Sequence, residues 1–111
     1  MRSDDRRVGD ILEAIERIER YSVRGRTAFD ADELIQNWIV RHLQVIGEAA
    51  RALTPNFRSR HSEIPWSEVI GMRTILVHRY FDIDPEVVWA VVERDLPRLK
   101  AQLARFEEED R

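Results

Sequence analysis

The sequence contains no cysteine among its 111 residues, so a disulfide framework, a thiolate zinc site and a thiol nucleophile are all excluded. It also lacks any run approaching the roughly 20 apolar residues that a membrane-spanning helix requires. Its first ten residues are charged and have no apolar signal core. We therefore expect a protein of the reducing cytoplasm, with no membrane association.

Familiar metal and nucleotide patterns are missing as well. The histidines at positions 42, 61 and 78 form neither an HxxxH nor an HExxH pattern, which argues against a zinc site. There is no GxxxxGK[S/T] loop and no GxGxxG turn, and no serine lies in a nucleophile elbow. We expect neither a metal site nor a bound cofactor.

What the sequence does contain is typical of a small helical domain. Hydrophobic residues make up 43% and charged residues 35% of the chain, a length of one ordinary domain, which we assign to residues 1–111. Apolar residues recur at three- and four-residue spacing in four stretches. The fold class predicted is all-α, a small antiparallel bundle of four to five helices. The predicted helices cover approximately residues 8–24, 31–53, 66–80 and 85–106.

Capping residues suggest where these helices begin and end. Gly25 is predicted to close the first helix, with Arg24 in its last turn. Asp30 reads as the N-cap of the second, with Glu33 completing a capping box. A loop is predicted from residue 54 to 65. Asp84 followed by Pro85 indicates the start of the last helix, which Pro97 should kink or split.

The second helix carries apolar residues on more than one face, which predicts a central position in the bundle. Gly47 lies in its interior, where glycine is unfavourable by about 1 kcal/mol relative to alanine. We therefore expect it to allow a close approach of another helix, either within the chain or across a dimer. Glu48 is expected to bind a backbone group or an arginine. His42 is interpreted as a packing or interface residue.

Charge is distributed unevenly along the chain. The net charge of −3 argues against a general nucleic-acid coat protein. Between residues 41 and 80, however, there are six arginines and only three acidic residues, so a local positive field can exist. The loop with Phe57, Arg58, Arg60 and His61 could contact a phosphate and stack on a base, although most such loops are merely solvated.

Three polar side chains mark the stretch from Met72 to Tyr80. Arg73 is followed after four residues by His78, and Tyr80 comes two residues later. On an α-helix Tyr80 would return to nearly the same face as Arg73, with His78 about 140° away. Spacing alone favours ordinary surface or core-edge residues for all three.

The pattern Arg73-x4-His78-x-Tyr80 nevertheless resembles the R-x4-H-x-Y signature of the HepT-like toxins, within the HEPN group of small helical proteins. Three further segments resemble family segments in the same order, across most of the chain: Ile46-Gly47-Glu48-Ala49, Ile64-Pro65-Trp66, and Phe81-Asp82-Ile83-Asp84 with Val88-Trp89. Thr74 is a departure, because many members carry asparagine there.

The resemblance implies the toxin of a bacterial toxin–antitoxin pair, a metal-independent endoribonuclease. Arg73 and His78 would be catalytic, with Thr74 and Arg79 as supporting contacts. The family implies a homodimer that brings two Arg/His pairs to one cleft. It also implies a MntA-like nucleotidyltransferase antitoxin that transfers AMP to Tyr80. The alternative is a non-catalytic dimeric module that binds a nucleotide or the nucleotidyltransferase.

Overall fold

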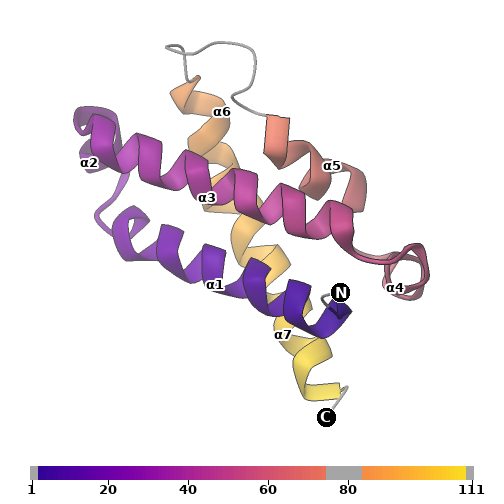
Figure 1. Ribbon diagram of the computed structural model, residues 1–111. Coiled ribbons are helices and arrows are strands. Elements are labelled where there is room, and N and C mark those ends of the chain that lie inside the picture. Colours follow the sequence, from indigo (N-terminus) through magenta and orange to yellow (C-terminus); the bar gives the residue numbers. More distant parts are fainter. Residues whose placement is uncertain (1–2, 75–83, 110–111) are drawn as a thin grey trace.

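The computed structural model describes residues 3–74 and 84–109, and within these residues every regular element is helical, which confirms the all-α prediction. Figure 1 shows the arrangement. The elements in chain order are α1 (Asp4–Ser22), α2 (Arg26–Ala31), α3 (Glu33–Ala52), α4 (Pro55–Arg60), α5 (Trp66–Gly71), the 3-10 turn η1 (Met72–Thr74), α6 (Pro85–Ala90), the π-helical turn η2 (Val91–Asp95) and α7 (Leu96–Glu109).

The core lies where α1 and α3 pack side by side and α7 crosses behind them (Figure 1). α3 contacts α1, α2, α5 and η1, which confirms its predicted central position. Fully buried isoleucine and leucine side chains from both long helices meet there: Ile11, Ile15 and Ile18 of α1, and Ile39, Leu43 and Ile46 of α3. None of the described helices is long and apolar enough to cross a membrane.

The link between α1 and α3 contains a short helix that the sequence reading missed. α1 ends at Ser22, and Gly25, with a φ of 92°, turns the chain into α2, so Arg24 lies beyond the last turn of α1. The predicted N-cap Asp30 is wrong, because Asp30 lies within α2. The cap of α3 is Asp32, whose side chain accepts a hydrogen bond from the backbone N–H of Leu34.

The predicted loop from 54 to 65 also contains a helix. Thr54 caps α4 by accepting a hydrogen bond from the Phe57 N–H, and Pro55 occupies the first helical position. Phe57 is only 2% exposed, and the His61 ring lies 3.6 Å from that of Phe106, centroid to centroid. The hypothesis that this segment stacks on a base is therefore wrong for Phe57, which belongs to the core.

The last helix begins where the sequence predicted, and its α-helical winding is interrupted just before Pro97. The Asp84 carboxylate accepts hydrogen bonds from the N–H groups of Glu86 and Val87 at the start of α6. Pro97 has no N–H to donate to the carbonyl four residues back. Just before it, Leu96 donates to the Val91 carbonyl five residues back, so the helix widens into η2 and continues as α7.

Candidate functional site around Arg73

Arg73 lies in η1, directly after the short helix α5. The predicted α-helix over residues 66–80 is wrong at residues 72–74, because the α-helix ends at Gly71 and tightens to 3-10 winding. Its remainder, residues 75–80, lies outside the described residues. Two local causes are visible: Gly71 is a poor helix former, and the Thr74 hydroxyl donates to the Gly71 carbonyl at 2.9 Å. Thr74 thus stabilises the turn that carries Arg73.

The backbone of Arg73 packs directly on Gly47 of α3. A Cβ atom added to Gly47 would lie 2.4 Å from the backbone nitrogen of Arg73 and 2.9 Å from its Cα. No real Cβ atom approaches backbone so closely, so only glycine allows this contact. The close approach predicted for Gly47 is confirmed, and it occurs within the chain.

The next residue of α3 binds the side chain. Arg73 Nη1 donates to Glu48 Oε1 at 3.2 Å, with the arginine side chain 34% and the glutamate side chain 58% exposed. The expectation that Glu48 binds an arginine is confirmed. Consecutive residues of α3 therefore contact Arg73 at two levels, with Gly47 against the backbone and Glu48 against the guanidinium.

Glu48 also lines an open groove of about 680 Å³ between α1 and α3. Three arginines border this groove, together with acidic residues and a floor of small side chains: Arg7, Asp10, Glu13, Ala14, Arg17, Arg41, Gln44, Val45, Ala49 and Ala52. His42 lines it too, but packs on Trp38 with ring centroids 4.4 Å apart and bonds the Trp38 carbonyl through Nδ1 at 2.7 Å. That confirms His42 as a packing residue.

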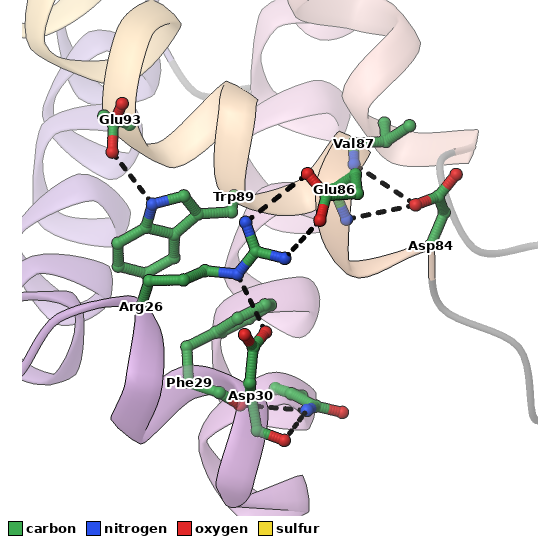
Figure 2. A network of polar contacts seen from close by, with 9 residues as sticks. Arg26, Phe29, Asp30, Asp84, Glu86, Val87, Trp89 and Glu93 are labelled. Carbon is green, nitrogen blue, oxygen red and sulfur yellow. Dashed lines mark hydrogen bonds and ion pairs between the residues drawn. The ribbon is translucent and has the colours of Figure 1, made fainter.

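A second arginine–glutamate pair holds the chain at residue 86, shortly after the segment 75–83 (Figure 2). Arg26 of α2 donates through Nη2 and Nη1 to the two carboxylate oxygens of Glu86, at 2.6 and 3.5 Å, and through Nε to Asp30 at 2.8 Å. The hydrogen bond to Glu86, and then that to Asp30, raises the pKa of Arg26 above its ordinary value. This network joins α2 to the start of α6.

The structure places only part of the predicted site. Arg73 and Thr74 adjoin Gly47 and Glu48 as described, whereas His78, Arg79 and Tyr80 lie outside the described residues. The Arg26–Glu86 pair was missed by sequence reasoning, because no local pattern links residues sixty positions apart. Within residues 3–74 and 84–109, no group of three or more His, Asp or Glu side chains could hold a metal ion.

Comparison with known proteins gives a consistent family. The family described as "Ribonuclease HepT-like" matches residues 11–106. A "Probable ribonuclease HepT" of Thermococcus cleftensis is 38% identical over 100 residues, which cover 87% of this chain and 89% of that protein. A "Putative RNase" of Caldanaerobacter subterraneus subsp. tengcongensis is 36% identical over 89 residues, covering 80% of this chain and 77% of that protein.

A third relative is longer than this chain. A "Gamma-glutamylcyclotransferase and putative RNase" of Methanocaldococcus jannaschii is 38% identical over 100 residues, 89% of this chain but only 45% of that protein. No solved structure matches significantly. The family match spans most of the chain and includes the R-x4-H-x-Y signature and the Gly47–Glu48 segment that contacts its arginine, so the chain belongs to the HepT-like ribonucleases of the HEPN superfamily.

Proposed function

We propose that the protein is a metal-independent endoribonuclease that acts as the toxin of a toxin–antitoxin pair in the cytoplasm. The observation that carries this proposal is the placement of Arg73. Its side chain is one-third exposed on a turn fixed against Gly47, and it forms one ion pair among the described residues. With respect to these residues, other guanidinium donors remain for a ligand, and their planar fork matches the oxygens of a phosphate.

The chemistry needs only the chain's own side chains. The ribose 2′-OH loses a proton to a base and attacks the adjacent phosphorus, and the 5′-oxygen leaves as it receives a proton. The products are a 2′,3′-cyclic phosphate and a 5′-OH. Arg73 would stabilise the charge on the phosphate oxygens during attack. His78 would transfer protons, since its unperturbed pKa suits both the acid and the base role near neutrality.

A homodimer would complete this site. One Arg73 and one His78 per chain offer a single proton-transfer group, whereas two chains facing each other would provide one histidine as base and one as acid. Exposed apolar side chains on the central helix, Leu34 at 78% and Val45 at 39%, are available for association. Light scattering should give twice the 13.2 kDa chain mass at micromolar concentration, and a monomer would contradict the dimer.

Neutralisation would act on Tyr80. We propose that a MntA-like nucleotidyltransferase transfers AMP from ATP to the Tyr80 hydroxyl, releasing pyrophosphate. The new phosphodiester would bring an anion near Arg73, where it competes with RNA for the guanidinium. Co-expression followed by intact-mass measurement should show an AMP-sized increase that maps to Tyr80 and is absent from Tyr80→Phe. An increase on Tyr21, or on no tyrosine, would remove Tyr80 from this role.

The function as a whole is tested by expressing the chain alone in a bacterial host. The wild type should arrest growth and degrade cellular RNA, whereas Arg73→Ala and His78→Ala should do neither while remaining folded by circular dichroism. A wild-type chain that is harmless and leaves RNA intact would favour the alternative, a dimer that only binds nucleotide or the nucleotidyltransferase.

A further inference from the structure

We propose that Glu48 is a positioning residue for RNA cleavage: together with Gly47 it fixes the direction in which the Arg73 guanidinium meets the scissile phosphate. This inference rests on the proposed ribonuclease function and assigns a role to a residue outside the R-x4-H-x-Y signature. It starts from the two successive contacts that α3 makes with Arg73.

The first contact fixes where the arginine starts. Because Gly47 has no Cβ, the backbone nitrogen and Cα of Arg73 lie against α3, nearer than any other residue type would allow. The 3-10 winding of η1 and the Thr74 to Gly71 hydrogen bond constrain the same backbone locally. The Cα of Arg73 therefore has little freedom, and its side chain is the remaining variable.

The second contact fixes where the side chain ends. An arginine has several rotatable bonds, and ordering it costs on the order of 2 kcal/mol of rotamer entropy. Glu48 accepts one hydrogen bond from Nη1 at 3.2 Å, so that part of this ordering is complete before RNA binds. A carboxylate that occupied both edges of the guanidinium would leave less of the fork for phosphate. In the part of the chain that the structure describes, a single contact orients the group and leaves other donors available.

Because the ion pair is exposed, its effect on the orientation of Arg73 can be measured separately from any effect on the stability of the fold. Arg73 and Glu48 are 34% and 58% exposed, and ion pairs this open contribute little to stability. Removal of Glu48 should thus alter the direction of Arg73 while leaving the fold intact. A matched control is Glu19, which pairs with Lys100 at 2.8 Å, also across two helices, with side chains 45% and 42% exposed.

The experiment measures single-turnover cleavage of a short RNA by the purified full chain, with wild type, Glu48→Ala, Glu48→Gln and Glu19→Ala. Glu48→Ala should lower the maximal rate at least about 10-fold, with a smaller change in the RNA concentration at half-maximal rate, because orientation matters most in the transition state. Glu48→Gln should stay within about 5-fold of wild type, since its amide oxygen still accepts from Nη1. Glu19→Ala should cleave normally, and all Tm values should lie within about 4 °C of wild type.

A second readout is independent of cleavage. The Arg73 Nε–H signal in a ¹⁵N NMR spectrum can be assigned by its loss in Arg73→Lys. The relaxation of this signal should report an ordered Arg73 side chain in the wild type and in Glu48→Gln. It should report a mobile side chain in Glu48→Ala alone. If wild-type protein cleaves no RNA, the proposed function fails, and this signal still decides whether Glu48 orders Arg73.

Three results would overturn the inference. A Glu48→Ala protein that cleaves like the wild type would show that the orientation of Arg73 comes from elsewhere. A folded Glu48→Gln as inactive as Glu48→Ala would show that the negative charge itself is required, as for a catalytic base. An unchanged Arg73 signal in Glu48→Ala would show that the ion pair does not order the side chain in solution.

Discussion

Arginine–glutamate pairs lie on both sides of the segment 75–83, and they are built differently. On the later side, Arg26 donates from all three of its nitrogens, to Glu86 and Asp30. On the earlier side, Arg73 donates a single hydrogen bond of 3.2 Å to Glu48 among the described residues. Arg26 thus uses all three of its nitrogens for carboxylate partners, whereas Arg73 uses one nitrogen within residues 3–74 and 84–109. Arg26 joins helices, and Arg73 is the arginine that we propose to bind the substrate.

The backbones of the two arginines differ as well. Arg26 opens α2 after Gly25, at a position with open space around the glycine. Arg73 has its backbone pressed on Gly47, so its position depends on a contact between distant parts of the chain. An arginine that joins helices through its charge does not need such a contact. A residue that must direct a planar group at a phosphate benefits from a fixed one.

The largest expected effect is the loss of RNA cleavage when Arg73, but not Arg26, is replaced. Arg73→Ala should reduce RNA cleavage by about 10²–10³-fold, as removal of a transition-state donor does. Arg73→Lys should lose at least about 100-fold, because an ammonium is a point charge without the bidentate fork. Arg26→Lys should cleave at close to the wild-type rate. Cleavage assays on folded proteins check all three.

The opposite order of cleavage rates would contradict the roles assigned to the two arginines. If Arg26→Lys lost activity and Arg73→Lys kept it, Arg26 would be the functional arginine. Circular dichroism of each variant serves as the control for folding.

The next effect concerns the contact beneath Arg73. Gly47→Ala would place a methyl group against Arg73 backbone atoms, so we expect unfolding free energy to fall by about 1–3 kcal/mol and cleavage to fall with it. Gly9→Ala is the matched control, because Gly9 is also helical but has open space at the Cβ position. It should stabilise the protein by about 0.4–1 kcal/mol. Urea unfolding measures both.

A Gly47→Ala protein as stable and active as Gly9→Ala would contradict the close contact between α3 and η1. Loss of activity with unchanged stability would instead mean that the turn shifts without strain.

The smallest effect is expected at the start of α6. Asp84→Ala removes the cap that accepts from Glu86 and Val87, and should lower stability by about 1 kcal/mol while cleavage changes by less than about 10-fold. Asp84→Ser keeps a capping oxygen and should retain most of the stability. Abolished cleavage by folded Asp84→Ala would show that this side, too, belongs to the active site.

Sequence patterns predicted the long helices because their signals are local and strong. The three- and four-residue periodicity of α1 and α3, and the Asp84–Pro85 start of α6, were correct. The cap of α3 was misassigned because Asp30 and Asp32 are both good caps, and only the helix α2 decides between them. Six-residue helices such as α2 and α4 are too short for periodicity to reveal.

Two contacts near Arg73 were predicted in part from the sequence, but their geometry was not. Gly47 was expected to allow a close approach and Glu48 to bind an arginine, yet nothing in the sequence specifies that both contact Arg73. The change from α-helix to 3-10 winding at Met72 was also missed, because it depends on the Thr74 hydroxyl and on packing against α3. Tertiary contacts decided what local propensity left open.

The central claim is that the chain cleaves RNA through Arg73, without a metal. The most direct measurement incubates purified wild type, Arg73→Ala and Arg26→Lys with end-labelled RNA in excess EDTA and identifies the product ends. We predict cleavage by wild type and Arg26→Lys, with 2′,3′-cyclic phosphate ends, and none by Arg73→Ala. Cleavage that EDTA abolishes and Mg²⁺ or Mn²⁺ restores, or equal cleavage by Arg73→Ala, would contradict it.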